Sequence, residues 1–380
     1  MVIKRWWRKI KKVAVIFGTR PEAIKMAPVI KELEGSPGLD VFVIVTAQHR
    51  ELLDQVLDLF TITPDYDLDI METEQSLEQI TSKVIQGLDQ ILSNERPDMI
   101  LVHGDTTTTF ASALAGYYKQ IPIGHVEAGL RTYNKYNPFP EEMNRRLSGV
   151  LAELHFAPTE EAKGNLLQEN VMKEKIFVTG NTVIDALLRT FNKDYEFVDP
   201  LIKDVDFKNK DIILLTAHRR ENLGKALTEI CEAVKKILIQ KPQVEIIFPM
   251  HPNPKVRRTV RRLLEEESRI HLIEPLGYKE FVNLMGRVDI ILTDSGGIQE
   301  EAPSLGKPVL VLRERTERPE AITAGTVQLV GHSQETIISK SLELLEDDKV
   351  YKRMAKKKNP YGDGKASKRI REALITYFSN

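Results

Sequence analysis

Short apolar runs alternate with helical stretches along almost the whole chain. Each run is followed by a polar turn and then by a stretch with helical spacing of its apolar positions, such as 22–34, 76–93, 225–239 and 334–347. This alternation predicts βαβ units and therefore parallel sheets. The predicted strands are 13–17, 41–45, 98–102, 121–126, 154–157 and 176–179, then 211–215, 244–248, 270–273, 289–292, 308–312 and 327–330.

These runs are apolar throughout, which is typical of parallel strands covered by helices on both faces. They fall into two groups, separated by a charged stretch without a predicted strand at 190–208. We therefore expect an α/β chain of two Rossmann-like, doubly wound domains facing a central cleft. The expected domains are 1–189 and 209–360, with 190–208 as the linker and a C-terminal helix within 361–380 that packs back on the first domain.

Composition excludes several other classes of protein. The 380 residues include 54 Lys and Arg against 55 Asp and Glu, so the whole chain has no charge footprint for nucleic acid. No stretch approaches the ~20 apolar residues of a membrane span, and we expect the basic N-terminal arm, 1–12, to be solvated. The single cysteine, Cys231, argues against a disulfide framework and a cysteine-based zinc site, and the expected location is cytoplasmic.

The usual cofactor motifs are missing from the sequence. No G-x-G-x-x-G follows a predicted strand, which argues against tightly held NAD. No H-E-x-x-H or Cys/His cluster indicates a catalytic metal, and no serine nucleophile elbow is present.

Ligands of doubly wound sheets bind beyond the carboxyl ends of the strands, so the residues that follow each strand are the candidates. Gly18-Thr19-Arg20-Pro21-Glu22 follows the first predicted strand. Pro21 suits the first helical position and should keep Arg20 outside the helix, beside a helix N-terminus that suits a phosphate. Lys25 lies one turn further on. The alternative is that Arg20 and Lys25 are surface residues that pair with Glu22.

Three carboxylates follow later strands of the first domain: Asp105, Glu127 and Glu141. Asp105 could simply cap the next helix, and an acid at a helix start, as Glu141 and Glu142 are expected to be, favours the helix dipole. If the three converge, they supply general acids and bases whose pKa values burial or mutual repulsion would raise.

The second domain offers different chemistry after its strands. Two loops contain histidines, His218 and His251, and a third contains Ser295-Gly296-Gly297, whose backbone N–H groups are open to a diphosphate. Glu301 could accept hydrogen bonds from ribose hydroxyls, and the arginines that follow the next strand, Arg318 among them, could neutralise phosphate charge. Together these loops indicate an anionic nucleotide ligand.

Strings spread along the chain resemble a known family. GTRPEAIKMAP, HGDTTTT, HVEAGLRT, PFPEEMNRR, VTGNTVIDAL, TAHRREN, HPNP, DSGGIQEEAP, RERTERPEA and NPYGDGKAS occur in order from about residue 13 to 370. They are similar to the motifs of the non-hydrolysing bacterial UDP-N-acetylglucosamine 2-epimerases. The resemblance implies a glycosyltransferase-B-like fold, a cytoplasmic homodimer and reversible conversion of UDP-GlcNAc to UDP-ManNAc without NAD or metal.

The resemblance also implies roles for particular residues. Asp105, Glu127 and Glu141 would be the acid/base carboxylates, and His218 a catalytic or diphosphate-side residue. UDP would be held by Arg20, Lys25, Ser295, Gly296, Gly297, Glu301 and Arg318, with Phe281 against the uracil and backbone near Leu276 at its polar edge. A second, activating substrate site would involve Gln48, His49, Arg219 and His251.

The residues fit this chemistry independently, because C2 has no adjacent carbonyl to acidify its proton. Without NAD, expulsion of UDP from C1 can acidify the C2 proton and give a glucal intermediate, which requires a base, an acid and diphosphate stabilisation. A hydrolysing epimerase that releases ManNAc, a UDP-sugar glycosyltransferase of the same fold and a catalytically silent sensor are the alternatives.

Overall fold

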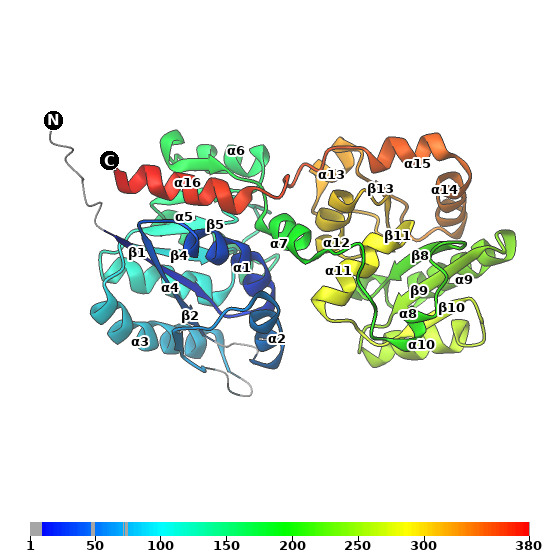
Figure 1. The fold of residues 1–380 in the computed structure, drawn as a ribbon, viewed down its shortest axis with the longest axis horizontal. Helices are drawn as coiled ribbons and strands as arrows, with labels where there is room; N and C mark the ends of the chain where they lie inside the picture. Colours follow the sequence, from blue (N-terminus) through cyan, green and yellow to red (C-terminus); the bar gives the residue numbers. More distant parts are fainter. Residues whose placement is uncertain (1–9, 47–49, 71, 73–74, 380) are drawn as a thin grey trace. The chain divides into compact units, whose positions relative to one another are not determined.

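The computed structural model describes residues 10–46, 50–70, 72 and 75–379, and the chain divides into two compact units. Unit 1 comprises Met1–Arg189 and Gly362–Asn380, and unit 2 comprises Thr190–Tyr361 (Figure 1). Each unit is a parallel sheet with helices on both faces, so the predicted fold class is confirmed. Residues 190–208 belong to unit 2 and contain the short helix α8 (Pro200–Lys203).

Unit 1 contains a seven-stranded sheet in the order β3-β2-β1-β4-β5-β6-β7. Its strands are β1 (Lys11–Phe17), β2 (Leu39–Val45), β3 (Tyr66–Asp67), β4 (Met99–His103), β5 (Ile123–Val126), β6 (Leu154–Ala157) and β7 (Ile176–Val178). Its helices are α1 (Arg20–Glu34), α2 (Arg50–Phe60), α3 (Leu77–Glu95), α4 (Thr107–Tyr118), α5 (Glu141–Leu151), α6 (Glu160–Gln168), α7 (Thr182–Thr190) and α16 (Ala366–Ser379). Of the strands, only β3 was not predicted, since its two residues, Tyr and Asp, form no apolar run.

Unit 2 contains a six-stranded sheet in the order β10-β9-β8-β11-β12-β13. Its strands are β8 (Asp211–Thr216), β9 (Val244–Pro249), β10 (Ile270–Ile273), β11 (Ile290–Thr293), β12 (Val309–Val311) and β13 (Val327–Leu329). Its other helices are α9 (Lys225–Gln240), α10 (Pro254–Leu264), α11 (Tyr278–Arg287), α12 (Gly296–Glu301), α13 (Pro319–Ala324), α14 (Gln334–Glu346) and α15 (Asp348–Ala355).

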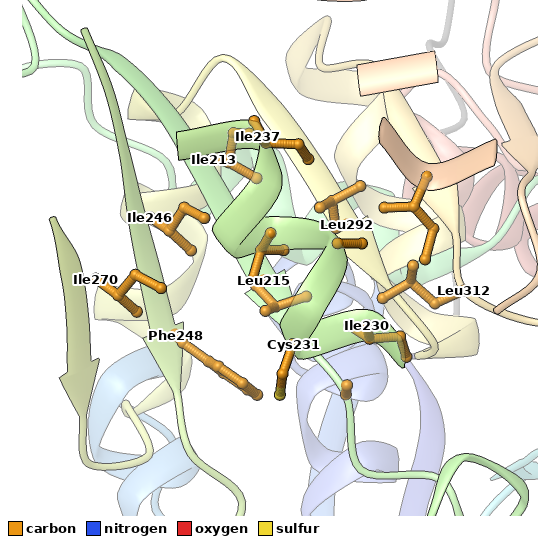
Figure 2. Close-up of a cluster of buried hydrophobic side chains, with 14 of the residues drawn as sticks. Ile213, Leu215, Ile230, Cys231, Ile237, Ile246, Phe248, Ile270, Leu292 and Leu312 are labelled. Atoms are coloured by element: carbon orange, nitrogen blue, oxygen red, sulfur yellow. The ribbon is translucent and has the colours of Figure 1, made fainter. Parts of the chain in front are cut away.

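The apolar runs of the sequence form the cores of these sheets. In unit 2, Ile213, Leu215 and Leu292 of the central strands lie against Ile230 and Cys231 of α9, all of them buried (Figure 2). Burial of this kind is the main favourable contribution to folding, at ~25 cal/mol per Å² of apolar surface. It also raises the pKa of the Cys231 thiol to about 12, so this cysteine is protonated at neutral pH.

Hydroxyl side chains mark where many helices begin. Ser76, Thr106 and Thr159 each accept a hydrogen bond from a backbone N–H in the first turn of the helix that follows. Such caps satisfy N–H groups that have no partner inside the helix. They therefore fix the loops at the carboxyl edges of the sheets, where the candidate site residues lie.

Candidate active site

The strand orders place a topological switch point in each unit, where ligands of doubly wound sheets bind. In unit 1, the chain runs outward in opposite directions from β1 and β4, and in unit 2 from β8 and β11. Arg20 begins the helix that follows β1, Asp105 lies in the loop after β4, and the loops after β8 and β11 contain His218 and Ser295. These four sequence-predicted residues thus lie at the switch points of their own sheets.

A buried carboxylate, Glu22, joins the two switch-point loops of unit 1. It accepts hydrogen bonds from the backbone N–H groups of Gly18 (3.1 Å) and Thr19 (2.8 Å), and from the hydroxyls of Thr106 (2.7 Å) and Thr109 (3.0 Å). Burial raises the pKa of Glu22, although hydrogen bonds from Thr106, Thr19 and Gly18 oppose the shift. Glu22 is therefore the residue that holds the β1–α1 loop to the β4–α4 loop.

This arrangement corrects two expectations about the first loop. Helix α1 begins at Arg20, with Thr19 as its N-cap, so Arg20 is the first helical residue and does not lie outside the helix. The alternative in which Glu22 pairs with Arg20 and Lys25 at the surface is also wrong. The Glu22 carboxylate accepts hydrogen bonds from the loop instead, and Lys25 donates to Glu127.

Glu127 is held in a strained backbone conformation directly after β5. Its φ of 62° lies in the left-handed region, which residues other than glycine rarely adopt. Its carboxylate accepts from Lys25 Nζ at 2.5 Å and from Asn181 Nδ2 at 2.8 Å, and lies 3.8 Å from His103 Nε2. Burial lowers the pKa of His103 to about 3 despite the attraction of Glu127, so His103 is neutral. Strain at a polar, partly buried carboxylate is typical of functional sites.

Asp105 forms an ion pair, and the suggestion that it caps the next helix is wrong. Thr106 is the N-cap of α4, and the Asp105 carboxylate contacts Arg145 of α5, at 2.9 Å from Nε and 2.7 Å from Nη2. Asn144 donates to the Asp105 carbonyl at 2.9 Å. Burial raises the pKa of Asp105, and Arg145 opposes this rise. A carboxyl group with such opposing influences on its pKa is a candidate for proton transfer.

The two acids at the start of α5 have different surroundings. Glu142 is buried and accepts from the backbone N–H groups of Thr132 (2.9 Å) and Tyr133 (3.1 Å), so it fixes the preceding loop. Glu141 is half-buried, and one of its carboxylate oxygens is buried with no hydrogen-bond partner in the described part of the chain. Residues four apart share a helix face, so Glu141 lies on the same face of α5 as Arg145, the partner of Asp105. Glu141 remains a candidate acid or base.

In unit 2, the buried carboxylate of Asp294 organises the loop after β8. Its Oδ2 accepts from the backbone N–H groups of His218 (2.7 Å) and Arg219 (2.8 Å) and from Asn222 Nδ2 (2.9 Å), and its Oδ1 lies 3.5 Å from His218 Nδ1. Burial lowers the pKa of His218, against the attraction of Asp294. An imidazole backed by a fixed carboxylate can accept or donate a proton.

Two guanidinium groups converge on Gly296, the first residue of α12. A Cβ placed on Gly296 would lie 3.6 Å from Arg219 Nη2 and 3.8 Å from Arg318 Nη2. Arg318 is the N-cap of α13, and its Nε donates to the buried carboxylate of Glu300. Two arginines that meet at one backbone segment are suited to bidentate contacts with phosphate.

The remaining predicted ligand residues of unit 2 lie beside this cluster. Tyr278 of α11 donates to Glu301 at 3.3 Å, so the start of α11 lies next to Glu301. Leu276 precedes α11 and Phe281 is part of it, both half-buried. In the predicted Ser-Gly-Gly turn, Ser295 is half-buried, Gly296 is buried and Gly297 is exposed.

The residues suggested for a second substrate site are only partly described. Gln48 and His49 lie outside the described residues. The ring of His251 is stacked on that of His218, with centroids 5.0 Å apart and an angle of 10° between the planes. Arg219 lies at Gly296 with Arg318. The structure thus brings Arg219 and His251 to the same cluster as the candidate catalytic and phosphate residues.

Sequence reasoning did not single out several residues that shape these clusters: Glu22, Arg145, Asn181 and Asp294. Most of their partners are distant along the chain and come close only in the fold: Arg145 is 40 positions from Asp105, and Asn181 is 54 positions from Glu127. Asp294 was detectable, because it directly precedes the Ser-Gly-Gly turn after a buried strand.

Two further observations concern the described ranges alone. Within them, no group of three or more His, Cys, Asp or Glu side chains is arranged to hold a metal ion. No helix in the same ranges is long and apolar enough to cross a membrane.

Comparisons with known proteins agree over nearly the full length. The model of the UDP-N-acetylglucosamine 2-epimerase family matches residues 31–375. A UDP-N-acetylglucosamine 2-epimerase of Bacillus subtilis (strain 168) is 53% identical over 367 residues, 97% of this chain and 96% of its own. A crystal structure of the Neisseria meningitidis UDP-GlcNAc 2-epimerase bound to UDP-GlcNAc is 53% identical, with a TM-score of 0.85, and the match covers 96% of this chain and 100% of that one. A Staphylococcus aureus structure with UDP is 50% identical, with a TM-score of 0.86, and covers 97% of each chain.

Two Rossmann-like units of this topology define a glycosyltransferase-B-like protein of the nucleotide-sugar class. Within that class, the chain belongs to the UDP-N-acetylglucosamine 2-epimerase family, whose members are isomerases.

Proposed function

We propose that the protein interconverts UDP-N-acetylglucosamine and UDP-N-acetylmannosamine by inverting C2 of the sugar, without releasing free sugar and without a cofactor. The observation that carries the proposal is that, in a chain of this family, one unit presents carboxylates and the other presents guanidinium groups. Carboxylates follow β4 and β5 in unit 1, and two guanidinium groups meet at Gly296 in unit 2. Both are needed for one reaction: elimination of UDP and its return.

In the proposed first step, the C1–O bond breaks and its electron pair leaves with the UDP diphosphate. A carboxylate takes the C2 proton, and the C1–C2 double bond of 2-acetamidoglucal forms. In the second step, a carboxylic acid returns a proton to the opposite face of C2, and the diphosphate oxygen adds to C1. Atoms and charge balance, so neither an oxidant nor a metal is required by this route.

We assign the proton transfers to Asp105, Glu127 and Glu141. The raised pKa of Asp105 and the strained, polar setting of Glu127 support this assignment. His218 is proposed to stabilise or protonate the departing diphosphate, because Asp294 supports its ring. Arg20, Lys25, Ser295, Gly296, Gly297, Glu301 and Arg318 are proposed UDP ligands, with Phe281 and Leu276 at the uracil and Arg219 and His251 at a second substrate site.

The test is turnover of UDP-GlcNAc in D2O, followed by NMR of the products. We expect deuterium at C2 of the epimerised UDP-sugar, with no need for added NAD. Release of ManNAc together with UDP would instead indicate a hydrolysing epimerase, and product formed only when an acceptor is added would indicate a glycosyltransferase. Retention of the C2 proton together with a requirement for NAD would refute the elimination route.

Variants of the carboxylates test the site assignment. Asp105→Asn, Glu127→Gln and Glu141→Gln should lower kcat by about 10²–10⁴ while UDP binds normally, because these groups act in the transition states. A stalled return step would release 2-acetamidoglucal and UDP. Glu153→Gln is the matched control, since Glu153 directly precedes β6 at the opposite edge of the sheet and pairs with Lys175 at 3.0 Å.

We further propose a cytoplasmic homodimer, and exposed apolar side chains on unit 1 support the dimer. Tyr117 (60% exposed), Tyr118 (64%) and Val150 (85%) lie at the ends of α4 and α5, two helices that pack against each other. Large apolar side chains exposed on neighbouring helices favour a protein interface. Val150→Asp should shift the mass measured by light scattering toward the monomer. The control Val198→Asp, at a residue of unit 2 that is 79% exposed, should leave the mass unchanged.

A further inference from the structure

The chain leaves unit 2 through a short buried segment, 359–361, whose polar groups bind the elements that carry Arg318 and its partner. Asn359 (7% exposed) and Tyr361 (3% exposed) are both buried. The sequence shows them within the string Asn-Pro-Tyr-Gly-Asp-Gly, and no step of the proposed reaction uses them. Buried polar groups on an irregular segment require a structural or functional reason.

Asn359 attaches this segment to the end of α12. Its Nδ2 donates to the backbone carbonyl of Glu300 at 2.6 Å and to Ser304 Oγ at 2.7 Å, and its Oδ1 accepts from the backbone N–H of Tyr361 at 3.0 Å. Both amide hydrogens and the amide oxygen are thus engaged. Only an amide side chain offers two donors and an acceptor in this geometry.

Tyr361 attaches the same segment to the first turn of α13. Its hydroxyl donates to Glu320 at 3.1 Å. Glu320 lies two residues after Arg318, the N-cap of α13. The segment therefore binds the two elements whose side chains form the Arg318–Glu300 pair.

We propose that Asn359, with Tyr361, is a positioning residue that holds Glu300 and α13 so that the Arg318 guanidinium stays at Gly296, where it binds the diphosphate. Asn359 acts through Glu300, whose carboxylate accepts from Arg318 Nε. Arg318 Nη2 remains directed at Gly296, 3.8 Å from where a Cβ would lie. This inference rests on the proposed function, because it assumes that Arg318 binds UDP.

Asn359→Asp tests the proposal, because it retains the acceptor and removes both donors. We expect the Kd for UDP, measured by calorimetry, to rise about tenfold, with a matching rise in KM for UDP-GlcNAc and little change in kcat. In the Arg318→Ala background, the same substitution should have almost no further effect on the Kd. A residue with a merely structural role would not lose its effect when Arg318 is absent.

Asn283→Asp is the matched control. Asn283 is also a buried asparagine of unit 2 and donates to a backbone carbonyl, that of Lys279, at 2.8 Å. The control should lower the melting temperature comparably and leave the Kd for UDP unchanged. If Asn359→Asp does not fold, Tyr361→Phe removes only the hydroxyl bond to Glu320 and should raise the Kd in the same direction, by a smaller factor.

The outcomes separate this inference from the proposed function. An unchanged Kd in Asn359→Asp or, where that variant does not fold, in Tyr361→Phe would overturn the inference. The inference would also be overturned if Asn359→Asp raised the Kd for UDP by the same factor in the wild-type and the Arg318→Ala backgrounds. If the wild-type protein binds no UDP, or if Arg318→Ala binds it normally, the assignment of the phosphate site fails, and the inference fails with it.

Discussion

Arg20 and Arg318 are both proposed to bind the diphosphate, yet their surroundings differ. Arg318 pairs with the carboxylate of Glu300, which is buried. In the part of the chain that the structure describes, no hydrogen bond or ion pair engages the Arg20 side chain. Removing Arg318 takes a guanidinium partner away from this buried carboxylate, which is destabilising. The two arginines should therefore respond differently to the same substitution.

We expect Arg20→Ala to weaken UDP binding about ten- to hundredfold, the loss of a charge-assisted hydrogen bond of ~1.5–3 kcal/mol, without changing the melting temperature. Arg318→Ala should weaken binding similarly and lower the melting temperature as well. Adding Glu300→Gln to Arg318→Ala should restore part of the stability and none of the affinity. Calorimetry with UDP and thermal unfolding of the same samples measure both effects. Unchanged UDP affinity in both single variants would remove these arginines from the phosphate site.

The pairing of Asp105 with Arg145 leads to a prediction about pH dependence. Burial raises the pKa of Asp105 and Arg145 lowers it, so Arg145→Leu should raise this pKa further. If Asp105 acts as a base, it must be ionised, and the acid limb of the kcat profile should then move to higher pH. Arg145→Lys should largely retain the wild-type profile. Arg146→Leu is the control, since Arg146 contacts Glu169 at 3.4 Å and not Asp105. If the acid limb of the kcat profile moved equally in this variant, the assignment of that limb to Asp105 would be contradicted.

At the scale of elements, three neighbouring strands of unit 1 each contain a buried histidine. His103, His125 and His155 belong to β4, β5 and β6, and His125 is directly opposite His155 in the parallel register. Burial is the main cause that lowers their pKa values, to about 3, 4 and 3 respectively. The folded state therefore holds all three neutral, whereas the unfolded chain protonates them near pH 6.5.

Stability should consequently fall as the pH drops below about 6.5, because the unfolded state then binds more protons than the folded state. Each buried histidine should cost roughly 1–2 kcal/mol of unfolding free energy by pH 5, at ~1.4 kcal/mol per pH unit. Urea unfolding of unit 1 at pH 7 and pH 5 measures the loss. His155→Leu removes one of the three groups and should reduce the difference between the two pH values. An unfolding free energy independent of pH over this range would show that the imidazoles are not held neutral.

The elements themselves could largely be predicted from the sequence, but their side-chain partners could not. Apolar runs located the strands because buried parallel strands contain little else, and they failed only at β3, a two-residue edge strand. Asp105 and Thr106 are adjacent and both suit a helix cap. The choice between them depends on Arg145, which is 40 positions away. The same holds for Asn359, whose partner Glu300 is 59 positions away. Local patterns therefore predict which loops hold the site, and tertiary packing decides which residues position it.

At the scale of the whole molecule, the chain passes between the units twice, at 189–190 and at 361–362. The segment 190–208, predicted as a linker, is packed on unit 2: Ile202 is buried, and the rings of Phe197 and Phe207 are stacked with centroids 5.7 Å apart. Cleavage of this segment by a protease would report on local opening of unit 2. Solution scattering is the better measurement of how the two units move.

If one UDP-sugar engages the carboxylates of unit 1 and the arginines of unit 2, binding must restrict the relative motion of the units. We expect saturating UDP-GlcNAc to lower the radius of gyration measured by X-ray scattering and to narrow the distance distribution. Arg318→Ala at the same ligand concentration should give a radius of gyration closer to that of the ligand-free protein, because its unit 2 binds the diphosphate more weakly. Glu153→Gln, whose side chain lies away from the switch point, should respond as the wild type does. Identical scattering with and without ligand, at a concentration where calorimetry shows binding, would mean that the carboxylates of unit 1 and the arginines of unit 2 do not bind the same substrate molecule.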